Sequence, residues 1–358
     1  MIKVLVVDDS ALARKLLGQV FAAEPDIEVR TARDGFEALE MLASFAPDVV
    51  TLDIHMPGMD GLACLDRIMI ERPVPVVMVS TLTAEGAEVT LEAMQLGAID
   101  FVAKPTGAVS LRIHELAPEL VEKVRSAAGA KLRATSRLKD RIKHRIGGGA
   151  GRPRRPVSGP VYGQPVSAAG DGLVLVGTST GGPPALEALL TGLTAEFSWP
   201  ILVAQHMPAS FTGPLARRLD KLCALNVVEV SRPVLIEPGF VYIGRGDADL
   251  IVSKRPAGLT AMAAPPLAYP WHPSTDRLVR SAMELVPASQ LIGVLMTGMG
   301  NDGAEAMTAL RTAGGRTIAE SQETAVVWGM PGELVKLEGA DYVLPLPRIA
   351  DHLQKMTP

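Results

Sequence analysis

The feature that most constrains the fold is a repeated alternation of short apolar runs with helical segments. In residues 1–124, four runs of strand length are separated by stretches with helical periodicity, as in residues 11–21, where Leu12, Leu16 and Val20 share one helical face. Strands and helices that alternate in this way form a parallel sheet covered by helices. The four apolar runs are Val4–Val7, Val49–Leu52, Val76–Val79 and Phe101–Ala103.

The same alternation resumes at Leu173 and predicts a second sheet. Apolar runs occupy residues 173–176, 201–204 and 291–295, and later ones lie near Thr317 and Tyr342. A chain of 358 residues is long enough for two cores of ordinary size. We therefore expect an α/β protein with one domain in residues 1–124 and a second, doubly wound and mostly parallel α/β domain in residues 171–358.

Residues 125–170 are predicted to be a linker, because Gly147–Gly151 and a proline- and serine-rich stretch interrupt the alternation. Residues 131–155 carry ten Lys/Arg and one acid, Asp140, for a net charge of +9, which leaves −13 on the rest of a chain whose total is −4. Such a segment is either a solvated linker or a tether that meets an acidic partner surface. Nucleic acid is the weaker candidate, because neither a helix-turn-helix pattern nor interleaved aromatic residues accompany the basic residues.

The chain is expected to be a cytoplasmic protein. It begins in an apolar strand without a charged leader, and no apolar run reaches about 18 residues. The two cysteines, Cys64 and Cys223, lie in stretches with helical periodicity, so we expect buried thiols rather than a disulfide or a metal pair. No Cys/His cluster has the spacing of a structural metal site.

Polar residues follow the predicted strands of the first domain at their carboxyl ends, where parallel sheets bind ligands. Three carboxylates gathered at one edge would repel one another strongly unless a cation lay among them. Oxygen ligands of this kind suit Mg²⁺, so we expect a magnesium site at this edge. The polar residues at the strand ends are Asp8, Asp9, Asp53, Ser80 and Lys104.

Four segments of the first domain carry a family resemblance: Val-Asp-Asp-Ser from residue 7, Leu-Asp-Ile-His-Met-Pro-Gly-Met-Asp-Gly from residue 52, Met-Val-Ser from residue 78 and Val-Ala-Lys-Pro from residue 102. They resemble the receiver domain of bacterial response regulators, which implies a flavodoxin-like, five-stranded parallel sheet. The resemblance also implies that Asp53 is the phosphoacceptor and that Asp8 and Asp9 join it as Mg²⁺ carboxylates. The residues that it implies for the phosphorylation switch are Ser80, Phe101 and Lys104.

The turn Gly177-Thr-Ser-Thr-Gly181 lies between a predicted strand and a helix opened by Pro183, and it allows three interpretations: a phosphate cradle, a nucleophile elbow or a plain connection. A P-loop needs a lysine after its last glycine and a dinucleotide loop needs G-x-G-x-x-G, and the turn has neither. It does match G-x-S-x-G, in which a sharp turn exposes the serine, here Ser179, next to helix amides that can stabilise an oxyanion. The motif alone leaves a plain connection open.

A base and an acid follow two further predicted strands, and they favour the nucleophile elbow. His206 follows one strand, and Asp302 follows another through a glycine-rich loop. Among the competing residues, His272 lies in a proline-bounded loop, His352 in a terminal amphipathic helix and Asp276 at a helix start, where an acid commonly caps the first turn. The chain order Ser, His, Asp differs from that of α/β-hydrolases, although triad geometry does not depend on order.

The segments around these residues carry a second resemblance. They include Val-Gly-Thr-Ser-Thr-Gly-Gly from residue 176, Gln-His-Met-Pro from residue 205, Met-Thr-Gly-Met-Gly-Asn-Asp-Gly from residue 296 and Trp-Gly-Met-Pro-Gly from residue 328. They resemble the catalytic domain of the chemotaxis protein-glutamate methylesterases/glutamine deamidases, and with the first domain the likeness runs nearly end to end. It implies a triad of Ser179, His206 and Asp302, with the backbone near Thr180 and Met299 at the oxyanion position.

Two segments depart from the pattern of that family. Where the family usually has His-Arg-Pro-Ser, this chain has Trp271-His272-Pro-Ser, and the usual Ala-Pro-Gly-Asp is Gly244-Arg245-Gly-Asp. Both segments lie outside the triad. We therefore expect them to affect the fit of the substrate more than the chemistry.

The resemblance implies a phosphorylation-regulated serine hydrolase that demethylates glutamate γ-methyl esters and deamidates glutamines on chemoreceptors during chemotactic adaptation. It implies Mg²⁺ in the receiver domain and no cofactor for hydrolysis. The implied partners are methyl-accepting chemoreceptors and a chemotaxis histidine kinase as phosphodonor, with the protein peripheral to receptor arrays and not embedded in the membrane. Two alternatives remain: a serine esterase that acts on a small diffusible ester, and a non-catalytic, receiver-linked binding protein.

Overall fold

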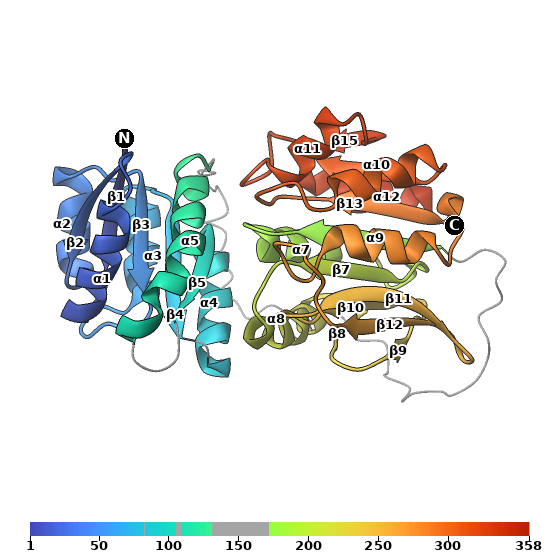
Figure 1. The fold of residues 1–358 in the computed structure, drawn as a ribbon, viewed down its shortest axis with the longest axis horizontal. Helices are drawn as coiled ribbons and strands as arrows, with labels where there is room; N and C mark the ends of the chain where they lie inside the picture. The colour runs from blue at the N-terminus through green and yellow to red at the C-terminus, as the bar shows by residue number, and fades with distance from the viewer. Residues whose placement is uncertain (82, 105–108, 131–171, 358) are drawn as a thin grey trace.

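The chain forms two α/β domains that lie side by side (Figure 1). The computed structural model describes residues 1–81, 83–104, 109–130 and 172–357. Most of the linker expected at residues 125–170, including the basic segment 131–155, lies outside these residues, whereas residues 125–128 continue the last helix of the N-terminal domain. Within the described residues, we find no helix that is both long enough and apolar enough to cross a membrane.

The N-terminal domain is built on a five-stranded parallel sheet in the order β2-β1-β3-β4-β5, as expected. The sequence does not reveal β2 as an apolar run, because this edge strand exposes Arg30 and Thr31 to solvent. The elements are β1 (Ile2–Val7), α1 (Ala11–Ala22), β2 (Ile27–Ala32), α2 (Gly35–Ser44), β3 (Val49–Asp53), α3 (Gly61–Glu71), β4 (Val76–Thr81), α4 (Ala84–Leu96), β5 (Asp100–Lys104) and α5 (Val109–Ala128).

The C-terminal domain is built on a seven-stranded parallel sheet in the order β15-β14-β13-β6-β7-β10-β8. The elements of this domain are β6 (Leu173–Thr178), α7 (Gly182–Thr191), β7 (Ile201–Gln205), α8 (Ala209–Leu222), β8 (Asn226–Val230), β9 (Val234–Leu235), β10 (Phe240–Gly244), β11 (Asp249–Arg255), β12 (Gly258–Ala264), α9 (Thr275–Met283), a short 3₁₀-helix (Ala288–Gln290), β13 (Leu291–Leu295), α10 (Ala304–Thr312), β14 (Arg316–Glu320), α11 (Met330–Lys336), β15 (Tyr342–Leu344) and α12 (Leu346–Met356).

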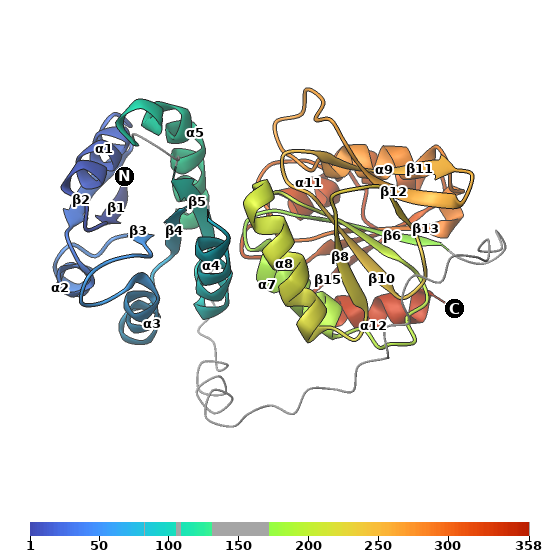
Figure 2. The ribbon, with the colours of Figure 1, turned by 90° about the horizontal axis from the view of Figure 1, so that it is seen from below.

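Helices cover both faces of this sheet, so the domain is doubly wound, as predicted (Figure 2). Successive side chains of a strand point to opposite faces. Val174 and Val176 of β6 accordingly join the core formed with α7, α8 and α12, whereas Leu173 and Leu175 join the core formed with α9, α10 and α11. All four side chains are buried, and full burial of such a side chain contributes about 1.5–3 kcal/mol. The continuous apolar run of β6 therefore reflects a strand buried on both faces.

The strand order reverses at the boundary between β6 and β13. From β6 the chain moves to β7 on one side, and it returns through β13 on the other side before continuing to β14 and β15. In open α/β sheets, ligands bind in the crevice beyond the carboxyl ends of the strands at such a switch point. The segments that follow β6, β7 and β13 therefore meet where a site is expected.

A second, three-stranded antiparallel sheet in the order β11-β12-β9 was not foreseen from the sequence. Its strands β11 and β12 form a hairpin whose turn places Gly258 at φ +131°, a conformation that favours glycine. One face of the hairpin is buried and the other is partly exposed, so neither strand appears as a long apolar run. Helix α9 packs on β11, and this sheet thereby supports the segment that precedes α9.

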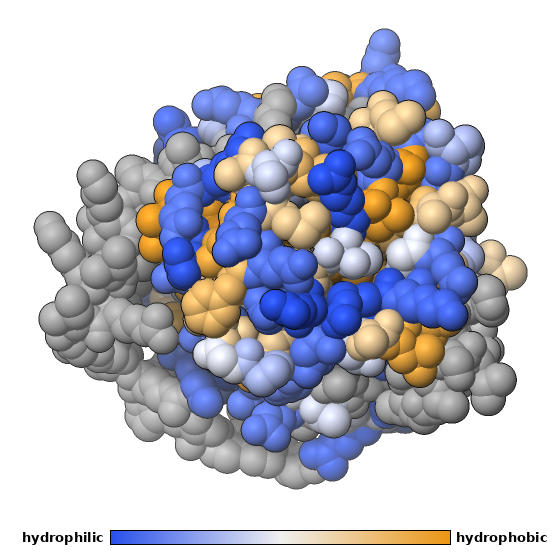
Figure 3. Space-filling model, turned by 90° about the vertical axis from the view of Figure 1, so that its left-hand side faces the viewer, coloured by the Kyte–Doolittle hydropathy of each residue, from blue (hydrophilic) through white to orange (hydrophobic). Residues whose placement is uncertain are grey.

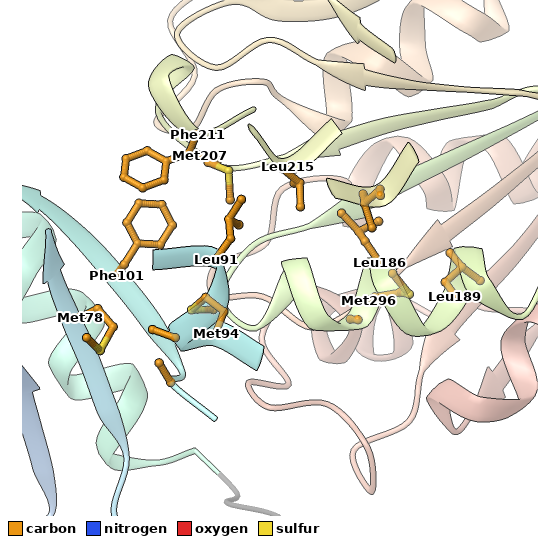
Figure 4. Packing of buried hydrophobic residues seen from close by; sticks show 14 of the residues in the cluster. Met78, Leu91, Met94, Phe101, Leu186, Leu189, Met207, Phe211, Leu215 and Met296 are labelled. Atoms are coloured by element: carbon orange, nitrogen blue, oxygen red, sulfur yellow. The ribbon is translucent and has the colours of Figure 1, made fainter. Parts of the chain in front are cut away.

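The two domains contact each other through α4 and β5 of the first and α7 and α8 of the second. Phe101 of β5 and Phe211 of α8 face each other with ring centroids 4.2 Å apart, and Leu91 and Met94 of α4 lie beside them (Figure 4). These side chains belong to one buried cluster that extends into both domains. The end of the N-terminal domain that faces away from the second domain is instead mostly hydrophilic, with scattered apolar side chains (Figure 3).

Candidate active site

Charged residues meet at the carboxyl edge of the N-terminal sheet. Lys104 Nζ lies 2.9 Å from Asp8 Oδ2 and 2.8 Å from Asp53 Oδ2. Asp8, Asp9 and Asp53 each offer a carboxylate oxygen, and these oxygens all lie within 4.8 Å of one another, an arrangement that fits a divalent cation with oxygen ligands. Burial raises the pKa of Asp53, although Lys104 opposes this shift. Burial alone would lower the pKa of Lys104, but the two neighbouring carboxylates outweigh it and raise that pKa.

The residues expected to form the switch lie on β4 and β5. Ser80 is buried, and its hydroxyl donates to the carbonyl of Gly86 over 3.4 Å. Phe101 is buried in the contact between the domains, with its ring against Phe211. The aromatic side chain at the expected switch position is thus part of the surface on which the second domain packs.

The expected nucleophile, Ser179, lies in the turn from β6 to α7 and is only partly buried. Gly181 has φ +75°, which L side chains rarely adopt, so the tight turn requires glycine there. The side chain of Gln205 donates to the carbonyls of Ser179 and His206 over 3.0 Å each, and its oxygen accepts from Thr178 Oγ1 over 2.6 Å. A buried amide side chain therefore holds the turn, a role that the G-x-S-x-G motif does not reveal.

His206 and Asp302 lie in contact, with 2.8 Å between His206 Nε2 and Asp302 Oδ2. Both side chains are nearly inaccessible to solvent. Asp302 also accepts from the hydroxyl of Ser274 and from the amides of Thr275 and Asp276. Burial alone would raise the pKa of Asp302, but the bond to His206, its charge and the backbone amides outweigh burial and lower that pKa. Asp302 therefore stays ionised beside His206.

The competing acid, Asp276, serves a different contact. Its carboxylate accepts from the amide of Ala306 in α10 over 3.0 Å, and burial raises its pKa. In the part of the chain that the structure describes, the carboxylate bonded to His206 is that of Asp302. His272 and His352 contact Asp249 and Tyr342. The geometry therefore favours His206 and Asp302 over the alternatives considered from the sequence.

Ser179 and His206 leave the sheet from neighbouring strands. Thr178 pairs with Gln205 in the register of β6 and β7, and the His206 amide donates to the Thr178 carbonyl over 3.0 Å. With Nε2 engaged by Asp302, the other ring nitrogen, Nδ1, is buried and has no hydrogen-bond partner among the described residues. A buried polar atom without a partner is costly. No hydrogen bond joins Ser179 to either ring nitrogen of His206 within the described residues. In a triad, the ring nitrogen that the acid does not hold is the one that takes up the proton of the nucleophile.

Thr297, which follows β13, connects its loop to the turn of Ser179. Its carbonyl accepts from the Ser179 amide over 3.0 Å, and its hydroxyl donates to the Thr180 carbonyl over 2.9 Å. Its own amide donates to the buried carboxylate of Glu320 over 2.8 Å. The Ser179 amide is thus already engaged, whereas the amides of Thr180 and Met299 donate to no group within the described residues. These two amides are therefore available to an oxyanion.

The N-terminal domain reaches this site directly. Thr180, the residue after Ser179, donates through its hydroxyl to Asp100 Oδ2 of β5 over 2.5 Å. Val326 packs against the core of the N-terminal domain. Met299 lines a cavity of about 920 Å³ together with residues of α1 and α5. Both residues expected at the oxyanion position thus lie at the boundary between the domains.

Of the two segments that depart from the family pattern, one contacts His206 and the other exposes Arg245 to solvent. The indole of Trp271 stacks on the ring of His206, with centroids 5.8 Å apart and an interplanar angle of 6°. His272 Nδ1 lies 2.8 Å from a carboxylate oxygen of the buried Asp249. Arg245 is exposed at the end of β10. The contact of Trp271 with His206 was not anticipated from the sequence.

Comparisons with known proteins support both resemblances. A family model described as CheB methylesterase matches residues 174–353, and one described as response regulator receiver domain matches residues 4–114. Two relatives named protein-glutamate methylesterase/protein-glutamine glutaminase come from Rhodopseudomonas palustris and Rhodospirillum rubrum. The first relative is 58% identical, and the match covers 98% of this chain and 96% of that relative. The second is 51% identical, and the match covers 99% of this chain and 95% of that relative.

A solved structure agrees with these sequence matches. The crystal structure of the Thermotoga maritima CheB methylesterase catalytic domain matches with a TM-score of 0.50 and 37% sequence identity, and the match covers 52% of this chain and 99% of that domain. The receiver match and the methylesterase match together account for both domains of the fold. The chain therefore belongs to the family of the CheB methylesterases, with a response regulator receiver domain at its N-terminal end.

Proposed function

We propose that this chain hydrolyses glutamate γ-methyl esters and deamidates glutamines on chemoreceptors during chemotactic adaptation, under the control of phosphorylation at Asp53. The observation that carries the proposal is the hydrogen bond between His206 and Asp302 at the sheet edge where Ser179 lies, in a chain whose close relatives bear the name of this activity. A hydrolase of this kind needs a nucleophile, a base and an orienting acid, and these residues supply all three.

In the first half of the proposed reaction, Ser179 Oγ attacks the carbonyl carbon of the ester or amide and His206 Nδ1 takes up the hydroxyl proton. Asp302 holds the other ring nitrogen and stabilises the imidazolium, because its lowered pKa keeps it ionised. The negative charge that develops on the carbonyl oxygen is stabilised by the Thr180 and Met299 amides. Removal of one such donor from an oxyanion hole typically costs about 10²–10³ in kcat.

In the second half, the imidazolium of His206 gives its proton to the leaving group, which departs as methanol from an ester or as ammonia from an amide. The product is an ester between Ser179 and the glutamyl side chain. Water attacks this ester with His206 again as base, and a glutamate carboxylate is released. Both reactions thus share one acyl-enzyme, and only the leaving group differs.

The receiver domain supplies the regulation in this proposal, with a chemotaxis histidine kinase as phosphodonor. Asp8, Asp9 and Asp53 would hold Mg²⁺, whose positive charge offsets the charges of the phosphoryl group and the carboxylates during transfer to Asp53. The ammonium of Lys104, which bridges Asp8 and Asp53, lies where it can pair with the added phosphoryl oxygens. The hydroxyl of Ser80 can follow the same oxygens.

The contact between the domains carries this regulation to Ser179. Movement of Ser80 and rotation of Phe101 would disturb the packing of Phe101 on Phe211 and, on the same strand, the hydrogen bond from Thr180 to Asp100. Loss of these contacts would free the surface over Ser179 for a receptor helix. In the unphosphorylated state, the receiver domain restrains the hydrolase.

The test is release of methanol from purified, methylated receptor membranes, measured with and without a small phosphodonor and Mg²⁺. We expect release that rises on phosphorylation, and Ser179→Ala should abolish it. Faster cleavage of a generic small ester than of receptor methyl esters would favour the esterase alternative. Unchanged methanol release by Ser179→Ala would overturn the mechanism.

A further inference from the structure

The segment of residues 271–275 wraps around the His206–Asp302 pair. At one end of the segment, Trp271 stacks on the His206 ring with nearly parallel planes. At the other end, the Ser274 hydroxyl and the Thr275 amide donate to Asp302 over 3.0 Å and 2.6 Å. One short stretch of chain therefore contacts both the expected base and the expected acid.

Trp271 also packs against the loop that carries Met299. A methyl group added at Gly300 would come within 2.8 Å of Cζ2 of Trp271, closer than side-chain carbons approach one another. Gly300 has φ +81°, so this position is left-handed as well as crowded. The indole thus contacts both the His206 ring and the loop of the second expected oxyanion amide.

A buried carboxylate fixes the backbone on which Trp271 stands. Asp249 is fully buried, and its oxygens lie 2.8 Å from His272 Nδ1, 2.9 Å from the Ser274 amide and 2.6 Å from a guanidinium nitrogen of Arg277. Burial alone would raise the pKa of Asp249, but these partners outweigh it and lower that pKa. The contacts of Asp249 thus fix the backbone that directly follows Trp271.

We propose that Trp271 is a positioning residue of the hydrolase. By stacking on His206, its indole fixes the plane of the imidazole while Nε2 stays on Asp302 and Nδ1 stays free to take up a proton, and it keeps water away from the bond to Asp302. An aromatic face also attracts a cation within about 6 Å, so the indole stabilises the imidazolium more than the neutral ring. Interactions that strengthen in the transition state raise kcat rather than lower KM. This inference rests on the hydrolase function proposed above.

The first test replaces Trp271 in the full chain, assayed by methanol release from methylated receptor membranes with a phosphodonor and Mg²⁺. Trp271→Ala should lower kcat by a factor of roughly 5 to 30 with little change in KM, and Trp271→Phe should restore most of the rate. Leu267→Ala is the matched control, because it removes an exposed apolar side chain from the segment leading to Trp271. Circular dichroism and thermal unfolding verify that each variant is folded.

A second test moves the indole without replacing it. Gly300→Ala should lower kcat further than Gly239→Ala, because Gly239 has a similar φ of +78° but open space around it. In a chain that already carries Trp271→Ala, the added effect of Gly300→Ala should shrink, since the clash with the indole is gone. This non-additivity is the sign of direct contact.

Three outcomes would overturn the inference. A raised KM with unchanged kcat in Trp271→Ala would mean that the indole only contacts substrate. Equal losses of kcat in Trp271→Ala and Leu267→Ala would mean that the stacking on His206 does not matter for the reaction. Equal losses of kcat in Gly300→Ala and Gly239→Ala would mean the same. A wild-type chain that releases no methanol would contradict the proposed function and this inference with it. If the wild type is active, each of the three outcomes above contradicts this inference alone.

Discussion

At the scale of single residues, the proposed chemistry depends on the contact between His206 Nε2 and Asp302 Oδ2 and on a serine presented by the neighbouring strand. We expect Ser179→Ala, His206→Ala and Asp302→Ala each to reduce methanol release by several orders of magnitude while the protein stays folded. The losses should not add in double variants, because the three residues act as a unit. Asp302→Ala should keep the highest residual rate, as the orienting acid does in other triads.

Asp276→Ala provides the matched control, since Asp276 neighbours Asp302 but accepts from the Ala306 amide. It should lower the free energy of unfolding by about 0.5–2 kcal/mol, as expected for loss of a capping contact, with little change in kcat. Chemical denaturation and the methanol assay measure the two effects separately. A larger loss of kcat in Asp276→Ala than in Asp302→Ala would show that the acid is wrongly assigned.

Ser179 and His206 were predictable from the sequence because each directly follows a buried strand, and Asp302 because it follows another strand through a glycine-rich loop. The residues that hold them were not, because their partners lie far away in the sequence. Glu320 reaches Thr297 from 23 positions away, and Asp100 reaches Thr180 from 80 positions away in the other domain. No local pattern encodes such pairs. The first arises where the carboxyl ends of β13 and β14 meet, and the second arises where the two folded domains pack together.

At the scale of elements, most of the parallel strands were predicted as apolar runs, whereas β2, β8, β10 and the strands of the small antiparallel sheet were not. Strands such as β6 are buried on both faces and appear as apolar runs, whereas β2 lies at a sheet edge and β11 and β12 form a small antiparallel sheet. The contact of α4 with α7 and α8 could not be predicted either, because it depends on the shapes of two folded surfaces.

The contact between β5 and the turn of Ser179 gives a prediction at this scale. Asp100→Ala removes the acceptor of the Thr180 hydroxyl from the receiver side and leaves every residue of the hydrolase domain in place. We expect the basal rate of methanol release without a phosphodonor to rise by up to about tenfold, since a hydrogen bond contributes about 0.5–1.5 kcal/mol.

Asp26→Ala is the control for this variant. Asp26 is an acid of the same domain that is paired with Arg125 of that domain. Its replacement should leave the basal rate unchanged. An Asp100→Ala chain whose basal rate equals that of the wild type, or falls below it, would contradict a restraining role for the contact.

At the scale of the whole molecule, the receiver domain is expected to restrain the hydrolase until Asp53 is phosphorylated. The fragment of residues 172–358 should release methanol without a phosphodonor, and faster than the unphosphorylated full chain, because the surface packed against the receiver is free. Asp53→Ala in the full chain should remain at the basal rate when a phosphodonor and Mg²⁺ are added. Removal of Mg²⁺ by a chelator should have the same effect on the wild type.

A fragment no faster than the unphosphorylated full chain would exclude steric restraint. Phosphorylation would then act positively, by docking the enzyme or recruiting its substrate. Comparing the fragment with the phosphorylated full chain on the same receptor membranes distinguishes the two cases, since positive action requires the full chain to be the faster of the two.

The basic segment of residues 131–155, which lies outside the described residues, gives a prediction that concerns the substrate. Neutralising its lysines and arginines should slow methanol release from receptor membranes and leave the turnover of a small soluble ester unchanged. Rising salt should have the same effect, because exposed charges are screened over about 8 Å at physiological ionic strength. Equal losses on both substrates would mean that these residues support the fold instead.

The hydrogen bond from Thr180 to Asp100 also implies an effect in the reverse direction, from the hydrolase domain to the Asp53 site. Whenever two sites are coupled through one equilibrium, each affects the binding at the other by the same factor. In the proposed mechanism, a receptor helix lying over Ser179 competes with the receiver surface that carries Asp100. Substrate bound to the hydrolase should therefore raise the affinity of the Asp53 site for a phosphoryl-like ligand by the same factor as that ligand raises the affinity for substrate. An adaptation enzyme built in this way senses how much of its substrate is present as well as whether the kinase is active.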